Sequence, residues 1–388
     1  MREFIQEIKS FFRKGDIVLL MMCLATSAFG CLVVASATNA AKFGGSSRYM
    51  LVQIGATLIG VIAYILISSI DADIYSEHRG VLTAMAVTLL MMLVPFGTDN
   101  GTGNKSWIPL PLINIYVQPA EICKIFYILI MASIMASHQN RISHVSSVVH
   151  MIIYLGLIAG INFVVSSDLG VTMIFVAIFA GMFIAGGVKM WWTIGGLSAI
   201  AAVFPILWTK VFSTEQQNRI LVLFMPEVID PTGLDERWHT TQSMNSLTGG
   251  GLFGQGLFNG NRTQGGQLFA QHTDYIFSSI GEELGYMGCL AVIIMLLIII
   301  GRCVWVGSKS KDYMRRMICF GAAFAMMFQV MINIGMCLGV MPVIGLTLPL
   351  ISYGGTSIIA TYTMLGLVSG VHARPAPRSH ERYIRAPL

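Results

Sequence analysis

The chain has 388 residues, of which 55% are hydrophobic and only 11% are charged. A soluble globular domain carries about 25% charged residues, so this composition excludes a soluble protein that must cover its whole surface with polar atoms. The formal net charge is +5, but the placement of the basic residues says more than the sum. The seven cysteines lie in or beside apolar runs without CxxC spacing, which indicates neither a zinc site nor a disulfide framework.

Long apolar runs recur along the chain, and each can cross a bilayer core of roughly 30 Å as an α-helix. Every backbone polar group must be bonded within its own segment inside lipid, which favours helices, and the alternation typical of a membrane β-barrel is not seen. The sequence therefore predicts an all-α polytopic integral membrane protein with about ten transmembrane helices. The predicted spans are 17–38, 49–70, 80–97, 119–137, 149–166, 171–188, 191–212, 274–301, 315–338 and 353–371.

Most Lys and Arg residues fall on one predicted side of the membrane, whereas the short loops of the other side hold only Lys42, Arg48 and Lys105. The positive-inside rule therefore predicts that both termini lie in the cytoplasm. We divide the chain into a cytoplasmic segment 1–16, a membrane domain 17–371 and a cytoplasmic tail 372–388. The first segment has helical apolar spacing suited to the inner membrane surface, and a plain polar lead-in is the alternative.

The predicted extracellular loop 213–273, between the seventh and eighth spans, is far longer than the usual connection of about 2–8 residues. It contains an amphipathic stretch at 219–224, the aromatic Trp238 and a glycine-dense run from 249 to 266. Glycine lets backbone approach backbone or a ligand closely, so we expect this loop to be folded and functional.

Asp274 is the first candidate for catalysis because it lies where this loop enters the eighth predicted span. An ionisable group at membrane depth is costly and usually faces a cavity or a partner. Partial burial would raise its pKa towards that of a working general base. With about 100° per residue, Ser278 and Gly281 share its helix face, so no second acid lies directly behind it. A helix N-terminal Asp, stabilised by the helix dipole, is the structural alternative.

Glu121 and Lys124 are three positions apart at the predicted outer start of the fourth span, where they can pair on one helix face. They form either a structural ion pair or a site that presents Lys124 to a ligand anion. Asp168 lies in a very short outer turn, where helix capping is at least as good an interpretation as catalysis. Trp107 lies in another outer loop, and anchoring at the membrane interface is the ordinary role of such a residue.

The Pro- and Gly-rich segment 339–355 predicts a shaped, non-helical turn that lines a cavity. Ser352, Tyr353 and the backbone N–H groups near Gly354 are placed to bind an anion at a helix start.

Several motifs together resemble the SEDS family (shape, elongation, division and sporulation). The resemblance runs from the first span to the last, and elongation-type members match best, although division- and sporulation-type members share the motifs. The family usually carries Arg before the loop Trp, where this chain has Ser106. The motifs are the glycine run 249–256, His272-Thr273-Asp274-Tyr275-Ile276-Phe277, Gly281-Glu282-Glu283-Leu284-Gly285, Asn333-Ile334-Gly335-Met336, Pro349-Leu350-Ile351-Ser352-Tyr353-Gly354-Gly355, and Gln118-Pro119-Ala120-Glu121 with Lys124.

This resemblance implies a bacterial peptidoglycan glycosyltransferase that polymerises lipid II on the outer face of the plasma membrane and releases undecaprenyl pyrophosphate. It implies a class B penicillin-binding protein, other elongation or division proteins and membrane lipids as partners, and no nucleic acid. It assigns catalysis to Asp274, and a divalent cation, Mg or Mn, is an expected aid to the leaving pyrophosphate. The expected substrate-binding residues are Arg48, Lys105, Trp107, Glu121, Lys124, His272, Ser352 and Tyr353.

Two other classes of protein share part of this pattern. A transporter or lipid flippase should show inverted repeats and helices broken at the membrane midplane, and the sequence indicates neither. A structural scaffold for cell-wall synthesis would need no carboxylate at the mouth of a cavity.

Overall fold

The computed structural model describes residues 13–40, 43, 47–98, 104–110, 115–268 and 270–374. Each predicted span is a helix, so the ten-span prediction is confirmed at the level of secondary structure. Most of the predicted segment 1–16 and of the tail 372–388 lies outside the described residues. The helices are α2 (Ile17–Ala37), α3 (Arg48–Ser69), α5 (Arg79–Met91) with α6 (Leu93–Phe96), α7 (Pro119–Ser137), α8 (Val145–Ser166), α9 (Leu169–Ala185), α10 (Met190–Lys210), α15 (Ile276–Lys309), α16 (Tyr313–Cys337) and α17 (Gly355–Ala373).

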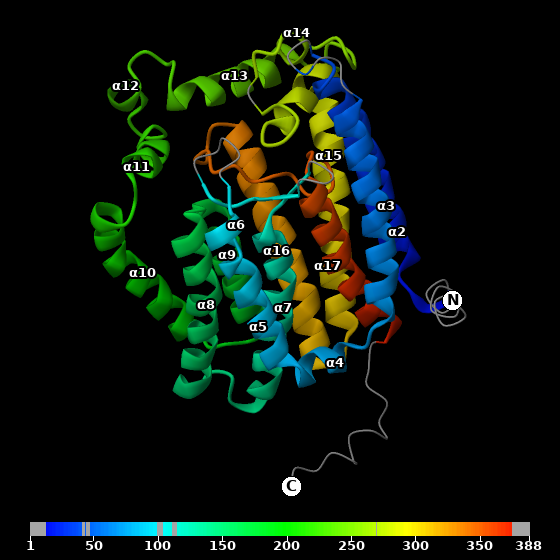
Figure 1. The fold of residues 1–388 in the computed structure, drawn as a ribbon, viewed down its shortest axis with the longest axis vertical. Coiled ribbons are helices and arrows are strands. Elements are labelled where there is room, and N and C mark those ends of the chain that lie inside the picture. The colour runs from blue at the N-terminus through cyan, green and yellow to red at the C-terminus, as the bar shows by residue number, and fades with distance from the viewer. Residues whose placement is uncertain are drawn as a thin grey trace.

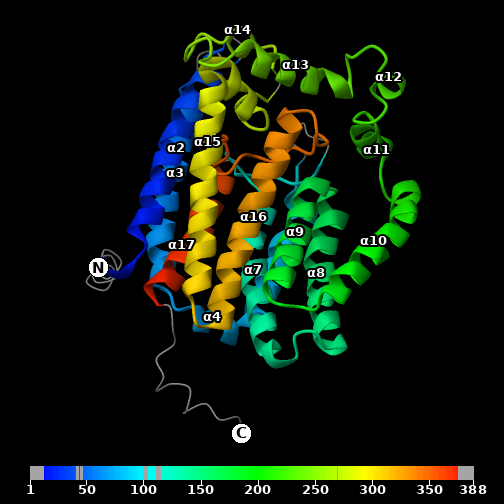
Figure 2. The ribbon, with the colours of Figure 1, turned by 180° about the vertical axis from the view of Figure 1, so that it is seen from behind.

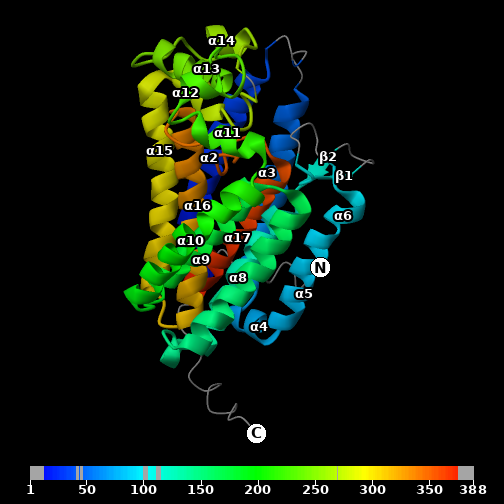
Figure 3. The ribbon, with the colours of Figure 1, turned by 90° about the vertical axis from the view of Figure 1, so that its left-hand side faces the viewer.

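Among the described residues, eight helical segments are long and apolar enough to cross a membrane. The shorter apolar helix α9 and the helix α17 stand beside them in the same bundle (Figure 1). The chain is therefore an all-α, multi-pass membrane protein, as the sequence predicts. It also contains a small antiparallel hairpin that the sequence did not predict, made of β1 (Ile108–Leu110) and β2 (Ile115–Val117), which lies beside the end of α6 (Figure 3).

The bundle has two groups of helices with α16 between them. Helices α2, α3, α15 and α17 form one group, and α5, α7, α8 and α9 form the other (Figures 1 and 2). Small residues bring α3 and α17 together, since a Cβ at Gly60 would lie 2.8 Å from the Tyr362 ring and one at Gly366 would lie 2.8 Å from the Tyr64 carbonyl oxygen. Helix α10 leans away from both groups and has no buried residue.

The two ends of the described chain meet at one end of the bundle, which we call the tail end. Asp16 caps α2 and donates its N–H to Ser369 Oγ of α17 at 3.0 Å. Its buried carboxylate also pairs with Arg302 of α15, with Nε 2.9 Å from Oδ2. The short helices α4 (Ala72–Glu77) and η2 (Gln139–Arg141) lie at this end as well.

The long loop between α10 and α15 is folded over the opposite end, which we call the Asp274 end (Figure 1). Its helices are α11 (Thr214–Leu221), α12 (Pro226–Ile229), α13 (Glu236–Gly249) and α14 (Asn261–Gln264). The glycine run after α13 packs into a break in α15 at Gly285, where φ is 68°. There Tyr286 N–H bonds to Gly251 O at 2.9 Å, and Gly256 N–H bonds to Glu283 O at 2.9 Å. Loop backbone thus satisfies the polar groups that the break frees.

Helix α15 differs from the predicted span 274–301 in two respects. It begins at Ile276, so Asp274 lies in the turn that precedes the helix, and the shared helix face predicted for Asp274 with Ser278 is wrong. It also runs on to Lys309 and contains the break at Gly285, which the continuous apolar run did not indicate. The break is stable because the backbone of the docked loop makes hydrogen bonds to the polar groups that the break leaves unpaired in α15.

We predict that Gly254→Ala unfolds the protein more easily. Gly254 has φ of 80°, and a Cβ there would overlap the Glu283 carbonyl. A non-glycine residue in this region costs about 1–3 kcal/mol before any clash is counted. The thermal midpoint in detergent should fall clearly. The matched control is Gly301→Ala, where a Cβ meets nothing within 4 Å; this helical change should be neutral or stabilising by about 0.5–1 kcal/mol. Equal midpoints for the two variants would contradict the packing described here.

Candidate active site

Asp274 lies in a tight turn that two other segments hold in place. The Asn333 side chain of α16 donates one hydrogen bond to the Asp274 carbonyl at 2.8 Å and another to the Leu346 carbonyl at 2.6 Å. Ser352 Oγ donates to the Thr273 carbonyl at 2.7 Å. These bonds fix the backbone at Asp274 and do not involve its carboxylate.

The carboxylate of Asp274 lies beside Gly345. A Cβ at Gly345 would come within 3.5 Å of Asp274 Oδ2, and the residue has φ of 66°. The segment 338–354 is non-helical, as its Pro and Gly content predicts, and it brings Gly345 next to the carboxylate. The Tyr353 N–H, which donates to the His272 carbonyl at 2.8 Å, joins the same segment to the turn.

The surroundings make Asp274 a weaker acid than a free side chain. Part of Asp274 is exposed, but the burial of the rest raises the pKa of its carboxyl group to about 6. The nearby negative charge of Asp168 also raises this pKa, and the positive charge of Arg219 in α11 lowers it. A carboxyl group with a pKa close to neutral is suited to accept a proton in a reaction near neutral pH. The predicted perturbation of Asp274 is therefore found, with burial as its main cause.

Asp168 is the N-cap of α9 and links three elements near Asp274. Its Oδ1 accepts the Val171 N–H at 3.1 Å, and its Oδ2 accepts the Ser106 hydroxyl at 3.1 Å. The Gln118 side-chain nitrogen lies 3.5 Å from the same oxygen. Burial raises the pKa of Asp168, and the charge of Glu121 contributes. The capping interpretation is confirmed, and the same side chain also acts electrostatically on Asp274.

Glu121 and Lys124 form the ion pair that their spacing predicts. Lys124 Nζ lies 2.8 Å from Glu121 Oε2, and each side chain is only 4% exposed. The pair lies at the start of α7, where Pro119 occupies the first turn. The ammonium group is therefore enclosed within the bundle, and Glu121 connects the pair to Asp168 through its charge.

The residues predicted around His272 form an aromatic group. The His272 ring lies 5.1 Å from the Tyr49 ring and 5.5 Å from the Tyr353 ring, measured between centroids. Arg48 is exposed at the start of α3, close enough for its charge to act on Tyr353. The rings of Tyr49 and Tyr353 therefore pack against His272, which lies two residues before Asp274 in the same turn.

Other predicted residues have structural contacts or lie apart from the carboxylate. Three donors of the predicted anion site are used within the protein. The buried Ser352 hydroxyl donates to the Thr273 carbonyl, the Tyr353 N–H donates to the His272 carbonyl, and the Gly354 N–H lies 3.4 Å from Gln53 Oε1. Lys105 is exposed, and Trp107 pairs through its backbone with Thr98 at 2.7 Å. Ser106, between them, is the residue of that loop that reaches Asp168.

Two residues that matter to the geometry were not singled out as site residues in the sequence. Arg219 belonged only to an amphipathic stretch, yet its charge acts on Asp274, Tyr275 and His239. Asn333 belonged only to a motif of the resemblance, and no local pattern indicates that its amide holds the turn. The sequence signal that could have indicated Arg219 is its position as a basic residue in the long outer loop.

Metal binding can be tested against the donor groups present. Within the described residues, no three His, Cys, Asp or Glu side chains gather closely enough to form a metal site. Mg²⁺ is usually held by one or two carboxylates together with substrate phosphates. Asp274 and Asp168 offer that limited donor set, which fits a cation that a phosphorylated substrate helps to bind and does not fit a site made by protein alone.

The fold and the site together define a multi-pass membrane protein with an acidic residue, perturbed by burial, at one end of its helix bundle. Comparison with known proteins specifies the family. Residues 16–376 match the FtsW, RodA and SpoVE family model, described as a cell cycle protein. The chain belongs to this family, which is the SEDS family that its motifs resemble.

Curated relatives match over nearly their whole length. One is the probable peptidoglycan glycosyltransferase FtsW of Trichlorobacter lovleyi, 30% identical over 370 residues, with 92% of this chain and 93% of the relative covered. Another is the peptidoglycan glycosyltransferase MrdB of Escherichia coli strain K12, 31% identical over 361 residues, with the same coverage of 92% and 93%.

Solved structures share the fold. A chain from a study of polymerization and crosslinking by a peptidoglycan synthase complex superposes with a TM-score of 0.77 at 25% identity, covering 92% of this chain and 97% of that one. The rod shape determining protein RodA of Thermus thermophilus superposes with a TM-score of 0.69 at 22% identity, covering 94% and 98%.

Proposed function

We propose that the protein is a peptidoglycan glycosyltransferase that polymerises lipid II into glycan strands and releases undecaprenyl pyrophosphate. Family membership and the names of its relatives support the reaction class. The observation that carries the proposal is Asp274, a partly exposed residue that backbone contacts hold in place and whose carboxyl pKa is raised to about 6.

In the proposed reaction, Asp274 acts as the general base. A sugar hydroxyl of the acceptor attacks the anomeric carbon of the donor, and its proton passes to the Asp274 carboxylate. The new glycosidic C–O bond forms as the bond between the anomeric carbon and the pyrophosphate oxygen breaks. Help of this kind is typically worth 10²–10⁴-fold in rate.

The leaving pyrophosphate develops negative charge and needs cations close by. Arg219 is the best-placed candidate, because its charge already acts on Asp274. Arg48 and Lys105 are exposed at the same end of the bundle and suit the more distant phosphate or the lipid surface. Lys124 is enclosed with Glu121 and suits a structural role.

A divalent cation, Mg or Mn, is part of the proposal. Asp168 would hold it jointly with the substrate pyrophosphate, and it would supply charge neutralisation to the leaving group. The residues of the chain then orient the acceptor hydroxyl, receive its proton at Asp274, and keep Asp168 fixed through Ser106.

We also propose that the protein resides in the bacterial plasma membrane with both termini in the cytoplasm, so that Asp274 faces outward. The excess of Lys and Arg in the segments of the tail end supports this orientation. We propose elongation as its process, with division or sporulation as the alternative, and a class B penicillin-binding protein as its partner. The structural likeness to a chain of a peptidoglycan synthase complex supports such a partnership.

We predict that Asp274→Asn abolishes polymerisation. Purified protein with labelled lipid II should form glycan chains, and the variant should lose at least 10²-fold in rate because no base receives the proton. Asp235→Asn is the matched control, since it removes an exposed carboxylate of the same long loop. Both variants should keep the thermal midpoint of the parent protein and its binding to the partner. Normal chain synthesis by Asp274→Asn would exclude the mechanism, and lipid II crossing vesicles without chain formation would indicate a flippase.

We predict that chelation of divalent cations slows polymerisation and that Mg²⁺ or Mn²⁺ restores it. The restored rate should depend on lipid II concentration, because the substrate supplies part of the coordination. The measurement is the initial rate of chain formation in EDTA with each cation added back. An unchanged rate in EDTA would remove the metal from the proposal and leave the role of Asp274 intact.

We predict opposite pH shifts from two neighbours of Asp274. The value of kcat/KM should rise with pH through an apparent pKa of about 6, because only the carboxylate accepts a proton. Asp168→Asn retains an N-capping side chain and removes a charge that raises the pKa, so the curve should move to lower pH. Arg219→Gln removes a charge that lowers the pKa, so the curve should move to higher pH. Shifts in the same direction would contradict this assignment of the base.

A further inference from the structure

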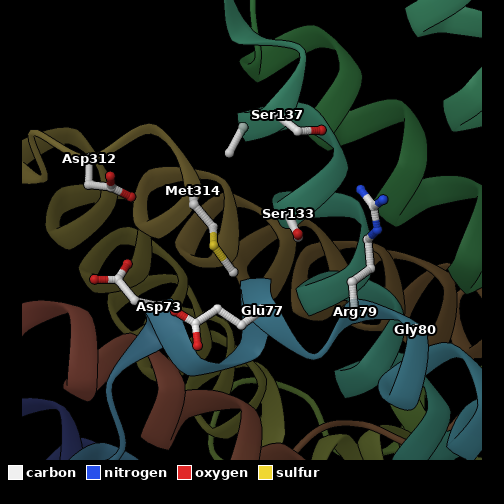
Figure 4. A pocket seen from close by; sticks show the side chains of 9 residues that line it. Asp73, Glu77, Arg79, Gly80, Ser133, Ser137, Asp312 and Met314 are labelled. Carbon is white, nitrogen blue, oxygen red and sulfur yellow. The ribbon is translucent and has the colours of Figure 1, made fainter. Parts of the chain in front are cut away.

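A polar pocket lies at the tail end, at the opposite end of the bundle from Asp274. It has a volume of about 510 Å³, and α4, the start of α5, the end of α7 and the α15–α16 connection form its walls. Figure 4 shows Asp73 and Asp312 at one side, Arg79 at the other, and the Met314 side chain between them. Neither the proposed catalysis nor the proposed partner uses this pocket.

The pocket lies at the depth of lipid headgroups. Helix α5 begins at Arg79, α7 ends at Ser137 and α16 begins at Tyr313, so the three membrane-spanning segments all terminate around it. The ends of apolar spans mark the boundary between the hydrocarbon core and the headgroup region. A ligand in the pocket therefore meets both water and the polar ends of lipids.

One wall of the pocket suits a phosphate group. Among the described residues, Arg79 has no ion-pair partner, and Ser133 is only 6% exposed with no hydrogen bond to its hydroxyl. The first backbone bond of α5 runs from the Leu82 N–H to the His78 carbonyl, so the N–H groups of residues 79–81 are not used inside the helix. A guanidinium, a buried hydroxyl and a helix N-terminus with Gly80 in the lining make a cationic, donor-rich wall.

The other wall suits an ammonium group. It carries the carboxylates of Asp73, Glu77 and Asp312. Arg315 Nη2 lies 3.2 Å from Asp73 Oδ2, and the Arg315 N–H donates to Asp312 Oδ1 at 3.0 Å. Each carboxylate has about four lone-pair positions, so it can accept from more than one donor at a time. Four carboxylates, those of Asp73, Glu77 and Asp312 and that of Asp71 beside Arg315, stand against the two guanidinium groups of Arg79 and Arg315, which disfavours a headgroup of net negative charge.

We propose that this pocket binds the phosphoethanolamine headgroup of a zwitterionic phospholipid. The phosphate lies against Arg79, Ser133 and the start of α5, and the ammonium group lies against Asp73, Glu77 and Asp312. The bound lipid joins α4, α5, α7 and the α15–α16 connection, so it stabilises the tail end of the bundle. The proposal is independent of the reaction at Asp274.

Lipid titration of the purified full-length protein tests the proposal. Phosphatidylethanolamine, phosphatidylglycerol and phosphatidylcholine with identical acyl chains are added in detergent, and bound copies are counted by native mass spectrometry. Phosphatidylethanolamine should bind at least about tenfold more tightly than the other two, because the first competitor lacks the ammonium group and the second lacks its N–H donors. Equal retention of the three lipids would overturn the proposal.

Variants separate the two walls. Arg79→Gln and Ser133→Ala should each weaken phosphatidylethanolamine binding, and Glu77→Gln should reduce the preference over phosphatidylglycerol. The matched control is Arg141→Gln, which removes an exposed guanidinium from η2 at the same end of the bundle and should change nothing. Thermal midpoints without lipid confirm that each variant is folded. Binding by Arg79→Gln that equals the parent protein would exclude the phosphate wall.

Soluble competitors distinguish a lipid from a free anion. Glycerophosphoethanolamine should compete weakly, since it lacks the acyl chains that hold the headgroup at the membrane surface. Inorganic phosphate should not compete at millimolar concentration. Full displacement of the lipid by inorganic phosphate would assign the pocket to a soluble anion and would refute the lipid proposal.

Discussion

The position of Asp274 depends on the side-chain amide of Asn333. This one group donates to two carbonyls, that of Asp274 at 2.8 Å and that of Leu346 at 2.6 Å, and so ties the entry of α15 to the segment between α16 and α17. A buried amide that makes both bonds is directional, and the only other donor to the Asp274 carbonyl among the described residues is the weak thiol of Cys337, at 3.7 Å. Because the contact is made through backbone, the carboxylate of Asp274 remains available for chemistry while its location is fixed by α16 and the segment 338–354.

The long loop can help to position Asp274 because hydrogen bonds attach it to α15. Its glycine run fills the break in α15 at Gly285, and the two acidic residues just before the break are buried. Glu282 accepts the Arg262 N–H at 2.8 Å and the Thr263 hydroxyl at 2.7 Å, and Glu283 accepts the Gln264 side chain at 2.8 Å. Buried carboxylates are tolerated when their oxygens are hydrogen-bonded. The motif from Gly281 to Gly285 therefore has a structural role as the attachment point of the loop.

Residues whose position follows from local pattern could be predicted from the sequence, and residues whose role is set by long-range contact could not. Run length predicts each membrane-spanning helix, and the spacing of Glu121 and Lys124 predicts their pairing. The sequence places Asp274 at the end of the bundle. Its position in the turn before α15, outside the helix, follows from the docked loop, and hydrophobic periodicity does not reveal that docking. The effect of Asp168 on the pKa of Asp274 joins segments more than a hundred residues apart in the sequence. The paired strands 108–110 and 115–117 form where no apolar alternation is long enough to indicate a strand.

The charges around Asp274 explain why a residue that departs from the family pattern is compatible with the proposed chemistry. Family members usually carry Arg before the loop Trp, where this chain has Ser106. In this chain the neutral Ser106 donates a hydrogen bond to Asp168 at 3.1 Å, which orients the carboxylate and leaves its charge in place. That charge contributes to the raised pKa of Asp274. Arg219 lowers the same pKa, so the basicity of Asp274 depends on the balance between two opposing charges, the carboxylate of Asp168 and the guanidinium of Arg219.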